Sequence, residues 1–216
     1  DAEMLADIGV DYLKYDWCTY TKVAKGSTLY ELMKPYLAMG GALRAQRRDI
    51  VYSLCQYGMG NVSAWGDKGG GHCGRTTGDS LSGEWGRGLH GVASFGFQQF
   101  GLDPFAGPGN WNAPDMLVVG RVGWGPKLHP TRLTPSEQYS HISLWCLLAS
   151  PLLIGCDLES LDAFTLGLLT NDEVIGVNQD PLGRQAARVA VRGAVQVWAK
   201  AMEDGSTAVG LFNLDE

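Results

Sequence analysis

Residues 10–18, which read VDYLKYDWC, constrain the fold more than any other stretch of the chain. Their apolar and aromatic side chains predict a buried strand that ends on a charged residue, Asp16. Because side chains in a strand alternate between two faces, Lys14 and Asp16 should share one face, and Tyr15 and Trp17 the other. Burial of an unpaired charge is costly, so Lys14 and Asp16 form either a structural ion pair or part of a functional site. This stretch alone leaves both interpretations open.

Strand and helix patterns alternate along the chain up to about residue 185. Further strands are expected at 50–55, 72–77, near 111–117 and at 152–156, with helices at 28–48, 85–101, 134–149 and 160–169. Glu31 is placed for a capping box, and Pro35 and Gly40-Gly41 should kink or divide the first long helix. This order is typical of a parallel α/β sheet. From Ala187 the apolar period becomes two, which predicts antiparallel hairpins.

The composition argues against several classes of function. The 216 residues carry a formal net charge of −6, and Lys and Arg never form a run longer than two, which disfavours nucleic acid and anionic membranes. The longest apolar stretch, residues 142–154, is interrupted by Ser and Pro and is too short to span a bilayer. Neither the five Cys nor the four His show metal-ligand spacing, and no dinucleotide fingerprint is present. We therefore expect no metal and no organic cofactor.

Acidic or acid-like residues follow several of the predicted strands. They are Asp16, Gln56, Asp79 and Asp115. Enzymes built as (β/α) barrels carry their chemistry at the carboxyl ends of the strands, so these side chains are candidates for one site. Arg75 precedes Asp79 by four residues and could orient it. Two facing carboxylates are the minimum for glycoside hydrolysis, and the positive charge of Lys14 would keep a nucleophilic Asp16 ionised.

Six strings in order across the chain resemble the melibiase-type α-galactosidases, glycoside hydrolase family 27. The strings are YLKYDWC, SLCQYG, GRTTGD, GPGNWNAPDML, LLASPLLIGCDL and VIGVNQDPLGRQ. The resemblance implies a (β/α)8 TIM barrel followed by a C-terminal antiparallel β-sandwich. It implies that residues 1–185 hold about strands four to eight of a partial barrel, without the N-terminal strands, and that residues 186–216 begin the sandwich.

The resemblance also assigns roles to individual residues. Asp16 corresponds to the nucleophile and Asp79 to the general acid/base of a retaining double displacement. The substrate-binding positions that it implies are Lys14, Cys18, Cys55, Gln56, Tyr57, Arg75, Asp115 and Met116. Two positions depart from the family pattern: Ala113 replaces the first Asp of WNDPDML, and Gln56 stands where many members carry Glu. The resemblance further suggests a Cys55–Cys73 disulfide, a partner for Cys18 on the missing strands, and buried free thiols at Cys146 and Cys156.

The function that the resemblance implies is removal of terminal α-linked galactose from oligosaccharides or galactomannan. Alternatives are a β-L-arabinopyranosidase or α-N-acetylgalactosaminidase of the same family, or a non-catalytic fragment of the enzyme. We expect the 216 residues alone to be inactive, because half of the implied sugar site is missing. We also expect an exported protein (secreted, periplasmic or lysosomal) whose partner is a carbohydrate, with neither nucleic acid nor membrane involved.

Overall fold

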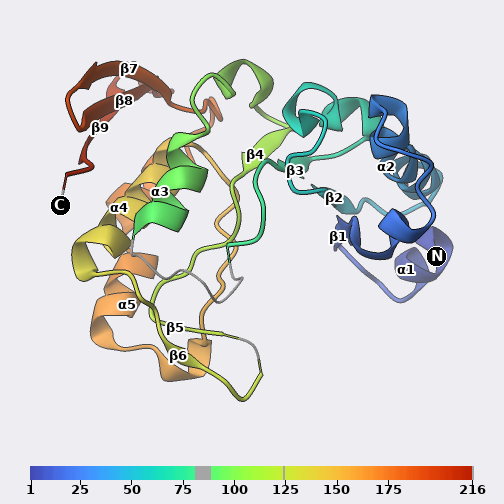
Figure 1. Cartoon of the computed structure of the whole chain (residues 1–216), viewed down its shortest axis with the longest axis horizontal. Coiled ribbons are helices and arrows are strands. Elements are labelled where there is room, and N and C mark those ends of the chain that lie inside the picture. The colour runs from blue at the N-terminus through green and yellow to red at the C-terminus, as the bar shows by residue number, and fades with distance from the viewer. Residues whose placement is uncertain (81–88, 124, 216) are drawn as a thin grey trace.

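The computed structural model describes residues 1–80, 89–123 and 125–215. Within them, four parallel strands form one sheet in the order β1 (Tyr12–Asp16), β2 (Val51–Cys55), β3 (Cys73–Arg75) and β4 (Trp111–Ala113). Beyond β4, Leu117 forms a parallel bridge with Ile154, which continues the same succession (Figure 1). The predicted α/β class with a parallel sheet is confirmed.

Six α-helices are described. They are α1 (Ala2–Asp7), α2 (Leu29–Arg44), α3 (Leu89–Phe97), α4 (Pro135–Leu147), α5 (Ala163–Leu169) and α6 (Asp172–Asn178). The helix predicted over 85–101 is α3, although residues 85–88 lie outside the described ranges. Helix α4 begins as predicted, because Thr134 and Glu137 form a complete capping box with Pro135 at the first helical position. None of the described helices combines the length and apolar character that crossing a membrane requires.

Helix α2 is not divided, contrary to expectation. It runs without interruption through Pro35 and Gly40. A side-chain carbon at Gly40 would overlap the carbonyl oxygen of Gly69, so this glycine allows a close approach between helix and loop. The capping box at its start is half formed: Thr28 accepts from the Glu31 amide, whereas the Glu31 carboxylate accepts from the Lys25 amide and the Tyr20 hydroxyl.

Two hydrophobic clusters hold the molecule together. One lies between β1, β2 and α2 and includes Tyr36, Tyr52 and Leu54. Here Leu13, Tyr15 and Trp17 pack on the side of β1 opposite Lys14 and Asp16, as the alternation predicts. The other cluster surrounds α4 and is the larger. Burial of this much aromatic surface supplies most of the driving force for folding.

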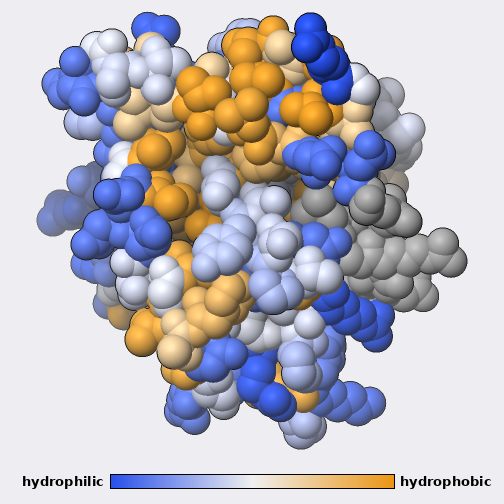
Figure 2. Space-filling model, turned by 90° about the vertical axis from the view of Figure 1, so that its left-hand side faces the viewer, coloured by the Kyte–Doolittle hydropathy of each residue, from blue (hydrophilic) through white to orange (hydrophobic). Residues whose placement is uncertain are grey.

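The predicted antiparallel hairpins are confirmed as a three-stranded sheet of β7 (Ala187–Arg192), β8 (Val195–Ala201) and β9 (Thr207–Asn213). Its inner face, with Trp198 and Phe212, joins the cluster around α4. Its outer face is apolar and exposed, with Val209 and Leu211 among its members, and Figure 2 shows apolar side chains gathered over this part of the molecule. A division of the chain after residue 185 stays a prediction.

Two details differ from the prediction. The strand expected over 152–156 is reduced to the single bridge at Ile154. A short antiparallel ribbon of β5 (Arg121–Val122) and β6 (His129–Pro130) was not expected, because two-residue strands carry no periodicity. At the end of α6, Asn178 donates to the Ser150 carbonyl, and in the turn that follows the Asp180 carboxylate accepts the Leu182 amide.

Candidate active site

Asp16 ends β1, and its carboxylate has two principal partners. The Tyr57 hydroxyl donates to Oδ1 at 2.5 Å, and Nζ of Lys14 lies 3.5 Å from Oδ2. Partial burial of Asp16 disfavours its ionised form and raises its pKa. The hydrogen bond from Tyr57 and the charge of Lys14 act in the opposite direction, as do the thiols of Cys18 and Cys55. These interactions outweigh the burial, so the pKa of Asp16 is lowered. The carboxylate is therefore held ionised while remaining partly accessible.

Tyr57 and Cys55 surround this carboxylate from the end of β2. Tyr57 adopts the left-handed backbone region, with φ of +60°, which turns its ring back toward β1. The hydrogen bond to Asp16 and burial raise the pKa of the Tyr57 hydroxyl, so it stays a donor. Burial likewise raises the pKa of the Cys55 thiol to about 12, so Cys55 is a neutral thiol beside the site.

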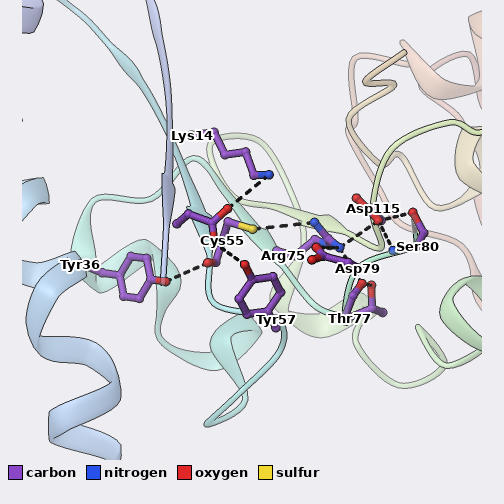
Figure 3. A network of polar contacts seen from close by, with 11 residues as sticks. Lys14, Tyr36, Cys55, Tyr57, Arg75, Thr77, Asp79, Ser80 and Asp115 are labelled. Atoms are coloured by element: carbon purple, nitrogen blue, oxygen red, sulfur yellow. Dashed lines mark hydrogen bonds and ion pairs between the residues drawn. The ribbon is translucent and has the colours of Figure 1, made fainter. Parts of the chain in front are cut away.

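Arg75, at the end of β3, lies at the centre of the network in Figure 3. Its Nη2 lies 3.1 Å from Oδ1 of Asp79 and 2.9 Å from Oδ2 of Asp115, and its Nη1 donates to Sγ of Cys55 at 3.7 Å. The guanidinium is almost wholly buried, whereas the Asp79 side chain is 59% exposed. Arg75 therefore ties the exposed carboxylate of Asp79 to the interior and to the strand that neighbours Asp16.

Asp115 follows β4 and is buried in a strained conformation, with φ of +94°. Its Oδ2 accepts hydrogen bonds from both the amide and the hydroxyl of Ser80. Ser80 was not among the predicted site residues, and only its position directly after Asp79 could have suggested it. Figure 3 shows two adjoining sets of contacts. Lys14 and Tyr57 hold Asp16, and Arg75 links Cys55 to Asp79 and, through Asp115, to Ser80. The Cys55 thiol also lies beside Asp16 and helps to lower its pKa.

The structure brings most of the predicted site residues together, but not all. Gln56 is fully buried one residue past β2, and among the described residues neither polar atom of its side chain has a partner. Met116 packs into the cluster around α4, against Gly155. Cys18 is exposed beside Asp16. Substrate contact by these three side chains, as by the other predicted site residues, stays a prediction.

The expected Cys55–Cys73 disulfide is wrong, because all five cysteines are free. Cys73 pairs in register with Ser53, so Cys55 lies two residues further along the neighbouring strand. Two residues correspond to about 6.6 Å along a strand, and with the strand spacing the Cα atoms are roughly 8 Å apart, beyond the reach of a disulfide. Sγ of Cys73 instead contacts the Tyr12 hydroxyl at 3.6 Å.

Ala113, one of the two departures from the family pattern, lies beside Arg75. The two residues pair in register between β3 and β4. The Nε atom of Arg75 is buried and has no hydrogen-bond partner among the described residues. The methyl group of Ala113 offers no acceptor, so this donor of the guanidinium is unsatisfied within the part of the chain that the structure describes.

The site can bind a polar ligand and exchange protons with it. It offers an ionised carboxylate, a second exposed carboxylate and a buried cation that links them. Among the residues that the structure describes, no three His, Cys, Asp or Glu side chains come together as metal ligands. Paired carboxylates at the carboxyl ends of parallel strands are typical of glycoside hydrolases.

Comparison with known proteins gives the particular family. Residues 1–180 match the melibiase family model described as alpha galactosidase A, and the chain belongs to this family. The α-galactosidase of Cyamopsis tetragonoloba is 38% identical over 213 residues, which cover 99% of this chain and 46% of that protein. The chain thus spans about half the length of the relatives it matches.

Solved structures agree with this assignment. A Bacteroides fragilis protein described as a candidate α-galactosidase/melibiase is 41% identical, with a TM-score of 0.87 over 99% of this chain and 45% of that one. The α-galactosidase of Saccharomyces cerevisiae with raffinose is 29% identical, with a TM-score of 0.80 over 99% of this chain and 50% of that one. The resemblance drawn from the six sequence strings is confirmed.

Proposed function

We propose that the complete protein removes terminal α-linked galactose by a retaining double displacement. The observation that carries the proposal is that both carboxylates lie beyond the carboxyl ends of neighbouring strands. The Cys55 thiol lies beside Asp16 and accepts from Arg75, and Arg75 pairs with Asp79. Asp16 is held ionised, as a nucleophile requires. Asp79 is exposed and within reach of a leaving group.

In the first step, a carboxylate oxygen of Asp16 attacks the anomeric carbon as the glycosidic bond breaks. Asp79 gives its proton to the leaving oxygen. In the second step, Asp79 accepts a proton from water, the water oxygen bonds to the anomeric carbon, and the bond to Asp16 breaks. Tyr57 and Lys14 stabilise the carboxylate that departs from the sugar. Buried Asp115 and Arg75 fix the geometry around Asp79.

The finer architecture is also a proposal. The succession of β1, β2, β3, β4 and the bridge at Ile154 supports strands four to eight of a (β/α)8 barrel. The free edge of β1 would then pair with the N-terminal strands. The apolar outer face of the sheet β7–β9 supports a C-terminal β-sandwich, because such a face needs a second sheet to cover it.

The proposed substrates are galactosyl oligosaccharides or galactomannan. The structure of the yeast relative was solved with raffinose, and we propose the same class of oligosaccharide as a substrate here. Gln56 and Tyr57 begin the loop after β2 without the small Ser/Ala pair expected of N-acetylgalactosamine specificity, which favours galactose. We further propose that the protein is exported, in keeping with a carbohydrate substrate.

The test compares the complete protein with its Asp16→Asn variant on p-nitrophenyl α-galactoside. Asn keeps the shape of the side chain but removes the nucleophile, so at least a thousandfold loss of kcat is expected. Asp11→Asn, an exposed change at the start of the same strand region, is the matched control. Near-normal activity of Asp16→Asn would contradict the assignment. Parallel assays with β-L-arabinopyranoside and α-N-acetylgalactosaminide identify the alternatives.

A further inference from the structure

One face of helix α4 is bonded to the backbone that carries Asp115. Three side chains at positions i, i+3 and i+7 of the helix lie in one stripe. Each bonds to a backbone atom of the segment 115–120: Trp145 Nε1 to the Asp115 carbonyl at 2.7 Å, His141 Nε2 to the Val118 amide at 3.1 Å, and Gln138 Oε1 to the Gly120 amide at 3.2 Å. The helix and the segment run in opposite directions, because successive helix positions contact successively earlier residues of the segment.

The middle contact is built to persist. Nε2 of His141 accepts the Val118 amide, which requires this nitrogen to be unprotonated. The ring is fully buried, and burial lowers the pKa of His141 to about 3. It also packs edge-on against Trp145, with ring centroids 4.2 Å apart. Burial therefore favours the neutral imidazole, which packs against the indole beside it.

Asp115 is the residue in this segment that needs support. Its φ of +94° is rare for a residue with a side chain and persists only where the surroundings hold it. The Trp145 indole donates to the carbonyl of this residue at 2.7 Å and is itself 1% exposed. On the other side, the Asp115 carboxylate holds Arg75 and Ser80. Asp115 therefore links the indole, through its carbonyl, to Arg75 and Ser80, through its carboxylate.

We propose that Trp145 is a positioning residue for the active site, acting through the backbone of Asp115. The indole hydrogen bond holds the left-handed conformation that aims the carboxylate at Arg75, and Arg75 in turn places Asp79. The catalytic part of this inference rests on the proposed glycosidase function. Trp145 touches neither Asp16 nor Asp79 in any described hydrogen bond, so its effect must pass through Asp115.

The chain offers a matched control in Trp198. Both indoles are buried, both belong to the cluster around α4, and both donate a hydrogen bond from Nε1. The acceptor for Trp198 is the Gln196 side chain in β8, which has no bond to Asp115, Arg75 or Asp79 among the described residues. Trp145→Phe and Trp198→Phe therefore remove the same donor at the same burial, and only the first removes it from Asp115.

The experiment measures three quantities in the complete protein and both variants: Tm, the KM and kcat on p-nitrophenyl α-galactoside, and hydrogen exchange of the Ser80 amide. Comparable falls in Tm are expected for both variants. In Trp145→Phe alone, kcat/KM should fall about tenfold, as expected for one hydrogen bond, and mainly through kcat, because the affected residue is the acid/base Asp79. The Ser80 amide, 2.6 Å from the Asp115 carboxylate, should exchange faster by a similar factor in that variant only.

Equal kcat values and equal Ser80 exchange rates in the two variants would overturn the inference. If the unmodified protein hydrolyses none of the three glycosides, the proposed function fails instead. The Ser80 exchange comparison still decides whether Trp145 positions Asp115, because it does not depend on activity.

Discussion

The guanidinium of Arg75 lies 2.9 Å from the carboxylate of Asp115, and both side chains are only 6% exposed. A buried pair of this kind is costly to break, because the remaining charge has no solvent to replace its partner. Asp115→Asn is therefore expected to lower the free energy of unfolding by about 3 kcal/mol, measured by urea denaturation. The exposed pair Arg48–Asp11 is the control, and Asp11→Asn should cost less than about 1 kcal/mol. Equal losses in the two variants would contradict the account.

Tyr57→Phe should change the pH dependence of activity. Burial opposes ionisation of Asp16, and the hydrogen bond from Tyr57 is the first of the interactions that reverse this effect and lower its pKa. Loss of the hydroxyl therefore raises the pKa of Asp16. As the pH falls, activity that requires ionised Asp16 is lost at a higher pH in the variant, which is measured as a shift of the acidic limb of kcat/KM.

Tyr20→Phe is the control for this prediction. The Tyr20 hydroxyl also donates to a carboxylate, that of Glu31 at 2.9 Å, and no described hydrogen bond joins this pair to Asp16. Its acidic limb should coincide with that of the unmodified protein. An unshifted limb in Tyr57→Phe would show that the hydroxyl does not tune Asp16.

Two adjacent glycines in α2 should respond in opposite directions to the same substitution. Gly40→Ala would force a methyl group into the Gly69 carbonyl, and overpacking of this kind costs about 1–3 kcal/mol. Gly41 has open space around its Cα, so Gly41→Ala should stabilise the helix by up to about 1 kcal/mol. Thermal unfolding distinguishes the two. A stabilising Gly40→Ala would mean that the helix and the loop do not approach as described.

The thiols of Cys55 and Cys73 should stay separate. Both are buried, and burial raises the pKa of Cys55 to about 12, so alkylation in the folded protein should be slow. After unfolding without reductant, peptide mapping should find each cysteine alkylated on its own peptide. A disulfide-linked peptide containing Cys55 and Cys73 would refute the strand register.

Local patterns predicted much of this structure. The alternation in residues 10–18 placed Lys14 and Asp16 on one face of β1, and the capping residues placed the start of α4. Contacts between distant segments could not be predicted in this way. In the sequence, Gly40 indicates a break or kink in the helix. Its close approach to Gly69, which explains the glycine, is seen only in three dimensions.

The same limit applied to the site. The strand ends identified Asp16, Gln56, Asp79 and Asp115 as candidates. The structure pairs Asp79 and Asp115 with Arg75, whereas the polar atoms of the Gln56 side chain have no described partner. Ser80 was missed because its partner lies 35 residues away. The Cys55–Cys73 disulfide was wrong because the register of β2 against β3 depends on packing that no local pattern records.

The central claim is that Asp16 attacks the sugar directly and that the product keeps the configuration of the substrate. The most direct test is proton NMR of the complete protein acting on p-nitrophenyl α-galactoside, recorded before the anomers of free galactose equilibrate. The account predicts α-galactose as the first product, because two displacements at one carbon restore the starting configuration. β-Galactose as the first product would contradict it, since a single displacement by water leaves no nucleophilic role for Asp16.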